Sequence, residues 1–231
     1  MSGGSVPDSA RAPRPADTGP PTTLMLVRHG RTALTEQGRL SGRGGVDPEL
    51  SPAGRADAAA VAALIAGLAE PAQVLVCSPL ARTRQTAAAI AAASGLDVRV
   101  RADWVEIGFG DWDGLTPAEL AERWPDELRA WQGSSTVAPP GGESLDELVA
   151  RIRVARAALV AEHPGRVVVV VTHATPVRVA VAEAMDAGPA ALWRTRIDPA
   201  SVTVLRFWSD DGAEVVTVNT TTHLPAPTTP P

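Results

Sequence analysis

Residues 166–173 have the sequence RVVVVVTH, an apolar run that ends in a threonine and a histidine. Five consecutive valines without polar alternation are typical of a strand that is buried on both faces, as in a parallel sheet covered by helices. We therefore predict a central strand over Arg166–Thr172, with His173 at its carboxyl end. The apolar pattern after His173 predicts a helix.

Five further strands are predicted on either side of this run, at Thr23–Arg28, Gln73–Cys77, Leu96–Val100, Ser201–Trp208 and Ala213–Thr220. The last two are predicted to form a hairpin, because Asp210, Asp211 and Gly212 supply turn chemistry between them. Helical patterns separate most of the other strands. Alternation of this kind is the signature of a layered α/β domain.

Three predicted helix starts share one sequence pattern, a hydroxyl residue followed by proline. They are Ser51-Pro52, Ser78-Pro79 and Thr116-Pro117. Serine and threonine are good N-caps, and proline is favoured at the first helical position. These starts predict helices near 52–69, 79–94 and 117–123. A further helix is predicted after Gly141-Gly142, ending at about His163.

The composition fits one ordinary domain, with 45% hydrophobic and 20% charged residues in a chain of 231. Residues 1–21 and 224–231 are rich in proline without apolar periodicity, so we predict disordered tails around a domain at 22–223. The net charge of −5 argues against nucleic acid as the main partner. The longest run without charged or polar side chains, Ala58–Ala69, is too short to cross a membrane.

Residue types that are rare or absent narrow the chemistry further. The chain has no lysine and no tyrosine, which excludes Schiff-base chemistry, a P-loop lysine and a tyrosine nucleophile. A single cysteine, Cys77, excludes an intrachain disulfide, so a cytoplasmic location is expected. Phosphatase loops with a cysteine nucleophile place an arginine six positions later, but position 83 is threonine. We therefore predict that Cys77 is a small buried residue at the end of a strand.

Three predicted strands end at groups that suit an anion. Arg28 and His29 end the first strand, His173 follows the central strand, and the strand Gln73–Cys77 leads into a helix that carries Arg82. Ligands of open α/β sheets bind beyond the carboxyl ends of the strands. Guanidinium groups bind phosphate in a bidentate manner, and helix N-termini add backbone donors. The sequence therefore predicts a small phosphomonoester as the ligand.

Hydrolysis of such an ester is among the slowest uncatalysed reactions, so a covalent phosphoryl-enzyme intermediate on a histidine is expected. The leaving alkoxide also needs a proton, and Glu106 is the candidate donor. It lies within DWVEIGFGDW at residues 103–112, where apolar and aromatic neighbours favour the protonated form of a carboxyl. A loop carboxylate beside packing tryptophans fits the sequence equally well.

The chain resembles the histidine phosphatase superfamily, in the branch that includes phosphoglycerate mutases and many bacterial phosphatases. The resemblance covers about residues 23–222 and rests on Arg28-His29-Gly30 with Thr32, Leu50-Ser51 to Gly54, Ser78-Pro79-Leu80-Ala81-Arg82-Thr83, Glu106, Gly141-Gly142-Glu143-Ser144 and Thr172-His173. It implies a three-layer α/β/α sandwich of the phosphoglycerate mutase type, with a central, mostly parallel sheet and a C-terminal hairpin.

The resemblance also implies roles for the five candidate catalytic residues. His29 is then the phosphorylated nucleophile, while Arg28, Arg82 and His173 bind the phosphate. Glu106 is then the proton donor to the leaving group and the base for the attacking water. No metal and no cofactor is implied.

Four further residues are expected near the substrate by the same resemblance. Thr35 stands where the family often has asparagine, and its hydroxyl is expected to bind the phosphate. Arg39, Gly42 and Arg43 lie in a glycine-rich loop that the resemblance places at the rim of the site.

The choice between phosphatase and mutase follows from absent residue types. The mutases that this chain resembles use tyrosine and lysine from a longer insertion, whereas only about 35 residues separate Glu106 from Gly141 here. We predict a phosphomonoesterase of the histidine acid phosphatase type that acts on a small phosphorylated metabolite. A mutase-type phosphotransferase and a non-catalytic module that binds a phosphorylated ligand are the alternatives.

Four segments resemble the acid phosphatase domain of bacterial bifunctional ribonuclease H/acid phosphatase proteins, at residues 41–44, 138–144, 172–176 and 186–189. That group is associated with α-ribazole phosphate, which joins sugar phosphates as a candidate substrate. Because only 21 residues precede the first strand, no ribonuclease domain is expected here. A monomer or a homodimer is expected.

Overall fold

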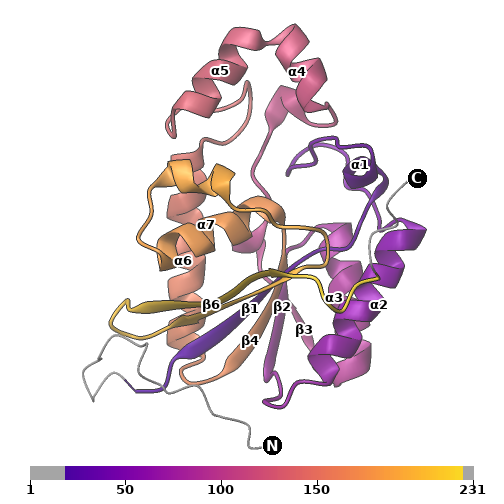
Figure 1. The fold of residues 1–231 in the computed structure, drawn as a ribbon, viewed down its shortest axis with the longest axis vertical. Helices are drawn as coiled ribbons and strands as arrows, with labels where there is room; N and C mark the ends of the chain where they lie inside the picture. The colour runs from indigo at the N-terminus through magenta and orange to yellow at the C-terminus, as the bar shows by residue number, and fades with distance from the viewer. Residues whose placement is uncertain (1–18, 226–231) are drawn as a thin grey trace, which may run out of the picture.

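A computed structural model of the chain describes residues 19–225. The proline-rich ends that were predicted to be disordered fall mainly on residues 1–18 and 226–231, outside the described range. The described residues form three layers, a sheet with helices on both sides (Figure 1). Within residues 19–225, no helix combines the length and the apolar character needed to cross a membrane.

The described part of the chain holds one six-stranded sheet in the order β3-β2-β4-β1-β5-β6. The strands are β1 (Thr22–Arg28), β2 (Val74–Cys77), β3 (Val98–Val100), β4 (Val167–Thr172), β5 (Val202–Phe207) and β6 (Ala213–Thr220). The first four run parallel to one another, whereas β5 pairs with both β1 and β6 in an antiparallel manner. This confirms the predicted mostly parallel sheet and C-terminal hairpin, although β3 begins at Val98 rather than Leu96.

Strand β4 lies between β2 and β1, and all six of its residues are buried. The register pairs Thr172 with Arg28 of β1 and Val171 with Cys77 of β2. The carboxyl ends of three neighbouring parallel strands therefore meet at one edge of the sheet. The residues that leave the strands at this edge are His29, Ser78 and His173.

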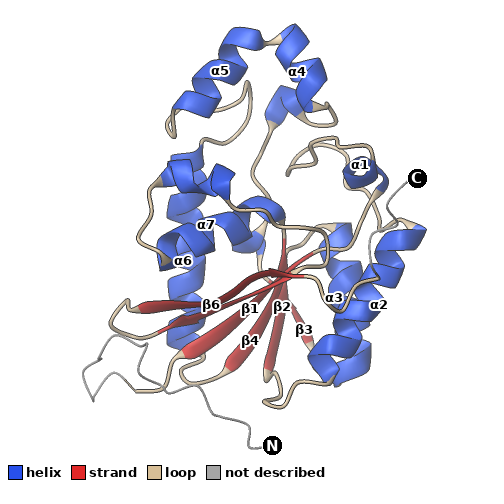
Figure 2. Cartoon of the chain, in the orientation of Figure 1, coloured by secondary structure: helices blue, strands red, loops and turns tan. Residues whose placement is uncertain are grey.

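The outer layers consist of the helices α2 (Pro52–Ala66), α3 (Ala81–Ser94), α6 (Leu145–Glu162) and α7 (Ala174–Ala184). Helices α2 and α3 cover one face of the sheet, and α6 and α7 cover the other (Figure 2). Successive side chains of a strand point to opposite faces. In β1, Met25 and Val27 accordingly pack in the core with α2, whereas Leu24 and Leu26 pack in the core with α6 and α7.

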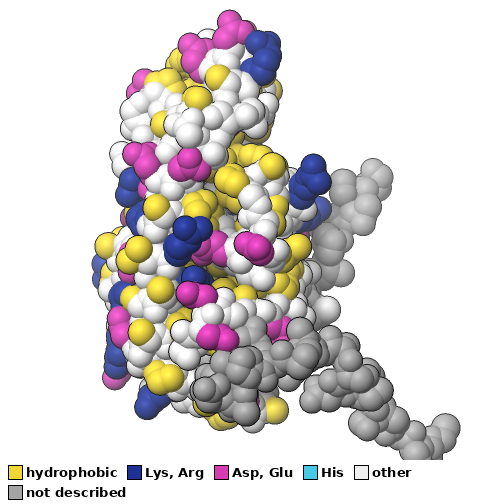
Figure 3. Space-filling view, turned by 90° about the vertical axis from the view of Figure 1, so that its left-hand side faces the viewer, with side chains coloured by type: hydrophobic (Ala, Val, Ile, Leu, Met, Phe, Trp, Pro, Cys, Tyr) yellow, Lys and Arg dark blue, Asp and Glu magenta, His cyan; other side chains and the backbone are white. Residues whose placement is uncertain are grey.

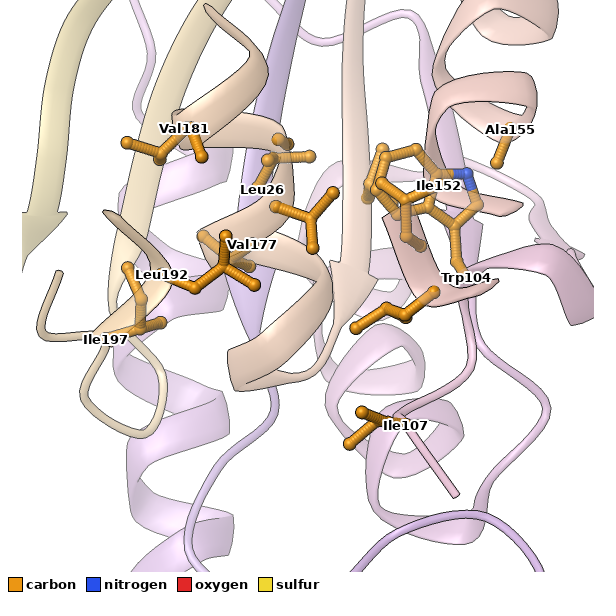
Figure 4. Packing of buried hydrophobic residues seen from close by; sticks show 14 of the residues in the cluster. Leu26, Trp104, Ile107, Ile152, Ala155, Val177, Val181, Leu192 and Ile197 are labelled. Atoms are coloured by element: carbon orange, nitrogen blue, oxygen red, sulfur yellow. The ribbon is translucent and has the colours of Figure 1, made fainter. Parts of the chain in front are cut away.

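The core between the sheet and α6 and α7 fixes the helix that follows His173. Figure 4 shows Leu26 of β1 beside Val177 of α7, and Ile152 of α6 belongs to the same core and lies next to Trp104. All of these side chains are fully buried. Trp104 of the 3-10 helix η1 (Ala102–Trp104) packs in the same core. Burying side chains of this size stabilises the fold by about 1.5–3 kcal/mol each.

Two of the three predicted helix starts are confirmed. The Ser51 hydroxyl accepts a hydrogen bond from the Gly54 amide at 3.0 Å at the start of α2, which ends at Ala66, three residues before the predicted end. The Thr116 hydroxyl accepts one from the Glu119 amide at 3.2 Å and starts α4 (Pro117–Arg123).

The third predicted start, at Ser78-Pro79, is wrong. Helix α3 begins at Ala81 with Leu80 as its N-cap. The Asp47 carboxylate accepts from the Ala81 amide at 2.9 and 3.1 Å, so an acidic side chain from a distant loop stands at this helix start. The Ser78 hydroxyl instead contacts His173, at 2.7 Å from its Nε2 atom.

A small helical cap lies above the sheet edge where the strands end (Figure 1). It contains α4 and α5 (Pro125–Gly133), and α5 was not predicted. Trp131 of α5 packs edge-on against the buried Trp112, with ring centroids 5.6 Å apart. Packing in the core therefore accounts for these two tryptophans.

Candidate active site

His29 is buried directly after β1, and its ring has a defined orientation. Nδ1 lies 2.7 Å from the Gly30 carbonyl oxygen. A carbonyl oxygen only accepts hydrogen bonds, so Nδ1 carries the proton and Nε2 keeps its lone pair. The backbone is fixed as well, because the His29 amide donates to the Thr172 carbonyl at 2.9 Å. Nε2 is therefore the nitrogen that can act as a nucleophile.

The surroundings keep this imidazole neutral. Burial, followed by the positive charges of Arg82 and Arg28, lowers the pKa of His29 well below its usual 6.5. Burial, Arg82 and His29 have the same effect on the pKa of His173. Both rings are therefore unprotonated at neutral pH and for some distance below it.

His173 is fully buried at the N-cap of α7, and its ring centroid lies 5.2 Å from that of His29. Nε2 lies 2.7 Å from the Ser78 hydroxyl. Nδ1 is buried without a hydrogen-bond partner among residues 19–225. If Ser78 donates to Nε2, the neutral ring carries its proton on Nδ1 and can donate it to a ligand.

Two arginines lie close to these histidines. The Arg28 Nη1 atom donates to the Ile197 carbonyl at 2.7 Å, and burial lowers the pKa of Arg28 to about 10, so the group is still charged at neutral pH. Arg82 is fully buried, and its Nη2 atom donates to the Ser41 carbonyl at 2.9 Å. Its Nη1 atom lies 3.4 Å from the Asp47 carboxylate.

Three buried N–H groups in this cluster have no partner within the described residues. They are Nε of Arg28, Nε of Arg82 and Nδ1 of His173. An unsatisfied buried donor costs about 1–3 kcal/mol, and more when it is charged. A phosphate dianion is the type of ligand that accepts hydrogen bonds from donors of this kind. The cluster therefore has the chemistry of a phosphate site.

Glu106 lies at the same edge and is almost completely buried. Its Oε1 atom accepts from the Ile107 amide at 2.9 Å, and Oε2 lies 3.5 Å from the Thr175 amide in the first turn of α7. Burial lowers the pKa of Arg82, and the negative charge of Glu106 opposes that shift. The Glu106 carboxyl therefore lies near enough to Arg82 for the two charges to interact.

A buried ion pair holds the segment that carries Glu106. Arg151 donates to the Asp103 and Val105 carbonyls at 2.8 and 2.9 Å. Its Nε and Nη2 atoms pair with the Glu143 carboxylate at 3.1 and 2.9 Å. Glu143 belongs to the Gly141-Gly142-Glu143-Ser144 motif, for which no role was predicted, and Arg151 was not predicted to lie near the site.

Two residues expected near the substrate make local contacts in this structure. The Thr35 hydroxyl accepts from the Thr32 amide at 2.7 Å and donates to the Thr32 carbonyl at 2.9 Å, within the cap of α1 (Ala33–Glu36). Arg39 donates to the Gly114 carbonyl at 2.7 Å and pairs with Glu119 of α4 at 2.9 Å. Their contacts to substrate stay predictions.

The other two expected rim residues lie against the Glu106 segment. A Cβ on Gly42 would overlap the Ile107 carbonyl oxygen, so only glycine allows this close approach. The Gly42 amide donates to Asp113 at 2.6 Å. The Arg43 amide donates to Ile107 at 3.2 Å, and its guanidinium pairs with Glu143 at 3.3 Å. This loop also supplies a carbonyl to Arg82, so it organises the site besides bordering it.

Cys77 is fully buried at the end of β2, as predicted. Burial raises the pKa of its thiol to about 11, which leaves the thiol protonated at neutral pH. Among the described residues, no three His, Cys, Asp or Glu side chains are grouped as they would be around a metal ion.

Besides Arg151, Ser78 and Arg178 lie beside the site although the sequence did not predict them there. The role of Ser78 was hidden because Ser-Pro is a helix-start pattern. Arg178 lies on α7, five residues after His173, and its pKa is lowered by burial and raised by the Glu106 charge. A signal for Arg178 was present, because it is the first charged residue in an otherwise apolar stretch of helix.

The neutral histidines predict a pH-dependent stability. Below pH 6.5 the unfolded chain binds protons that the folded His29 and His173 do not bind. The free energy of unfolding is therefore expected to fall as pH drops from 6.5 through the lowered pKa values, by up to about 1.4 kcal/mol per pH unit for each histidine.

Urea denaturation at pH 7.5 and 5.5 measures this effect. The double variant H29N/H173N should lose less stability between the two pH values than the unsubstituted protein. H223N is the matched control, since His223 lies outside the cluster with Nε2 2.9 Å from the Ala200 carbonyl. Equal losses in all three proteins would contradict the assignment.

Ser78→Ala is expected to lower kcat/KM about tenfold, because it leaves the buried Nε2 of His173 without its hydroxyl partner and frees the ring to reorient. Ser78→Thr keeps the hydroxyl and should recover most of the activity. Thermal unfolding of both variants separates a loss of orientation from a loss of fold. Full activity in Ser78→Ala would show that the ring needs no such partner.

Comparisons with known proteins agree with the geometry of the site. Residues 24–221 match the model of the histidine phosphatase superfamily (branch 1). The bifunctional protein Rv2228c of Mycobacterium tuberculosis is 43% identical over 206 residues, which cover 89% of this chain and 56% of the relative. The chain thus spans about half the length of that relative.

Solved structures share the fold. The mycobacterial glucosyl-3-phosphoglycerate phosphatase, determined with VO3, has a TM-score of 0.78 and 31% identity, covering 87% of this chain and 100% of that one. The α-ribazole phosphatase of Shigella flexneri has a TM-score of 0.75 at 22% identity, covering 86% of this chain and 96% of that one, which is a likeness of fold alone. With nearly all of its described residues matched, the chain belongs to branch 1 of the histidine phosphatase superfamily.

Proposed function

We propose that the chain is a phosphomonoesterase that passes the phosphoryl group of a small metabolite to His29 and then to water. One observation carries this proposal. Nε2 of His29 is oriented by the Gly30 carbonyl and lies in a cluster where buried N–H groups of Arg28, Arg82 and His173 have no partner among residues 19–225.

In the first half-reaction, Nε2 of His29 attacks phosphorus and the bond from phosphorus to the ester oxygen breaks. Glu106 gives its proton to the departing oxygen, which leaves as the alcohol. In the second half-reaction, the Glu106 carboxylate takes a proton from water, and the water oxygen attacks phosphorus. The P–N bond breaks, its electron pair returns to Nε2, and phosphate leaves.

The fixed charges suit this chemistry. Arg28 and Arg82 keep their positive charge at neutral pH and therefore cannot give a proton to the leaving group. That role falls to the Glu106 carboxyl. Charge-assisted hydrogen bonds contribute about 1.5–3 kcal/mol each, so the covalent route has to supply much of the remaining acceleration. The low pKa of His29 keeps the nucleophile unprotonated below pH 6.5. This property supports an acid phosphatase.

The comparisons support a phosphatase that acts on a sugar phosphate or a related ester. The structure with 31% identity over its whole length is named a glucosyl-3-phosphoglycerate phosphatase. The α-ribazole phosphatase shares the fold only, so α-ribazole phosphate is the weaker candidate.

We assign the activity to the domain at residues 22–223. We also propose a cytoplasmic location, because a buried free cysteine such as Cys77 suits a reducing compartment.

Release of inorganic phosphate from p-nitrophenyl phosphate between pH 4 and 8 tests the proposal. Turnover at these pH values is the expected result. A protein that binds phosphate without turnover would be a binding module instead. Rapid conversion of 3-phosphoglycerate to its 2-isomer in the presence of 2,3-bisphosphoglycerate would show a mutase.

A further inference from the structure

Arg178 is a half-buried arginine beside the site to which the proposed reaction gives no role. Its Nε atom donates to the Thr195 carbonyl at 2.9 Å. Its guanidinium carbon lies 5.8 Å from the centroid of the Trp193 ring, on the 3-10 helix η3 (Pro189–Arg194). Trp193 is 42% exposed, which is unusual for so large an apolar side chain.

Arg178 is anchored next to the phosphate-binding Arg28. Arg178 donates to the carbonyl of Thr195, and Arg28 donates to the carbonyl of Ile197, two residues further along the same segment. The Cα atoms of residues two apart are separated by about 7 Å at most. The two guanidinium groups therefore lie side by side on one segment of the chain.

Arg178 also lies on the side of Glu106. The Thr175 amide is 3.5 Å from the Glu106 carboxylate, and residues three apart share one face of a helix. Arg178 is three residues after Thr175. The Glu106 charge also raises the pKa of Arg178, against the lowering by burial. In the proposed reaction Glu106 protonates the leaving alcohol, so Arg178 faces that alcohol and not the phosphoryl group.

The side chains of Arg178 and Trp193 suit a ligand that carries an anionic group. Within residues 19–225 the hydrogen bonds of Arg178 use Nε alone, which leaves its Nη donors for a ligand. A guanidinium fork matches a carboxylate or a phosphate in geometry and in charge. The exposed Trp193 ring adds an apolar wall for the carbon skeleton.

We propose that Arg178 and Trp193 form a leaving-group subsite that binds an acidic group, a carboxylate or a second phosphate, on the alcohol part of the substrate. The inference rests on the proposed function and narrows it. The preferred substrates are then phosphate esters of acidic alcohols, and esters of neutral alcohols are hydrolysed less well.

The test compares two pairs of substrates that differ in the acidic group. For the carboxylate the pair is 3-phosphoglycerate and glycerol 3-phosphate, and for the phosphate it is 1,3-propanediol bisphosphate and its monophosphate. The measured quantity is the ratio of kcat/KM for the acidic member to that for the neutral member. Because it is taken within one enzyme, a general loss of activity cancels from this ratio.

The unsubstituted protein should show a ratio of about ten or more for at least one pair, and that pair identifies the acidic group. Arg178→Gln should lower this ratio about tenfold, and Arg178→Lys should lower it less, since lysine keeps the charge without the fork. Arg194→Gln is the matched control, because it removes an exposed charge from the same 3-10 helix and should change the ratio less than twofold.

Three results would overturn the subsite. They are a protein without preference for either acidic substrate, an unchanged ratio in Arg178→Gln, or an equal fall in Arg194→Gln, which would indicate long-range attraction only. The first needs no variant, so the test stands if Arg178→Gln fails to fold. Failure of the proposed function gives a different result, because no phosphate ester, p-nitrophenyl phosphate included, is then hydrolysed, and the subsite falls with it.

Discussion

His29→Asn is expected to lower kcat on the order of 10⁴-fold or more and to abolish any phosphoenzyme. Asparagine places an amide near the position of Nδ1, where it can still donate to the Gly30 carbonyl. It has no atom at the position of Nε2, which is the nitrogen with the free lone pair. The substitution therefore removes the nucleophile and leaves the donors of Arg28, Arg82 and His173 in place.

The measurement combines steady-state kinetics with rapid quenching, in alkaline detergent, of the enzyme mixed with a ³²P-labelled ester. Unsubstituted protein should carry label that is stable in alkali and lost in acid, as expected for a phosphohistidine. His223→Asn is the matched control and should label normally, because the His223 ring bonds to the backbone carbonyl of Ala200 and not to a side chain of the cluster. Labelling of His29→Asn, or more than about 1% of normal turnover, would rule out the covalent route through this residue.

The assembly of the candidate phosphate-binding groups could be predicted from the sequence because it depends on strands. Apolar runs locate strands, and parallel strands bring their carboxyl ends to one edge. The register confirms that expectation. It pairs Arg28 with Thr172, so His29 and His173 follow one residue later at the same edge of the sheet.

Ser78 shows where local patterns fail. A hydroxyl before proline caps a helix in two places in this chain, but at Ser78 the partner is His173, which is 95 residues away in the sequence. The amide of Ala81 is then bonded by Asp47, 34 residues away. Which of two acceptable hydrogen bonds a serine makes is decided by tertiary contacts, and a single sequence does not record them.

The arginines show a similar limit. Figure 3 shows the side of the molecule on which α6 and α7 lie, where basic and acidic side chains are interspersed. Arg153 of α6 and Glu183 of α7 form an ion pair at 2.7 Å. Arg151 of α6 and Arg178 of α7 belong to the same helices but point toward the site. The packing of each helix on the sheet decides which arginines face the site, so composition alone could not separate the groups.

Glu106→Gln is expected to slow the two half-reactions to different extents, depending on the leaving group of the ester. Glutamine has the same size and can still accept from the Ile107 amide, but it neither donates an acidic proton nor accepts one from water. General acid–base catalysis contributes about 10²–10⁴-fold, so kcat for an alkyl phosphate such as glycerol 3-phosphate should fall by that factor. Phosphoryl transfer from p-nitrophenyl phosphate should fall much less, because p-nitrophenolate leaves without a proton.

The second half-reaction should be slowed for every ester, because the attacking water needs the Glu106 carboxylate whichever alcohol has left. Glu106→Gln mixed with p-nitrophenyl phosphate should therefore release a burst of about one p-nitrophenolate per enzyme and then turn over slowly, with phosphoenzyme accumulating. Glu49→Gln, which neutralises an exposed carboxylate elsewhere, should show no burst of this kind and near-normal turnover. Equal losses for both esters without a burst would mean that Glu106 only shapes the site, and the proton would then have to come from another group.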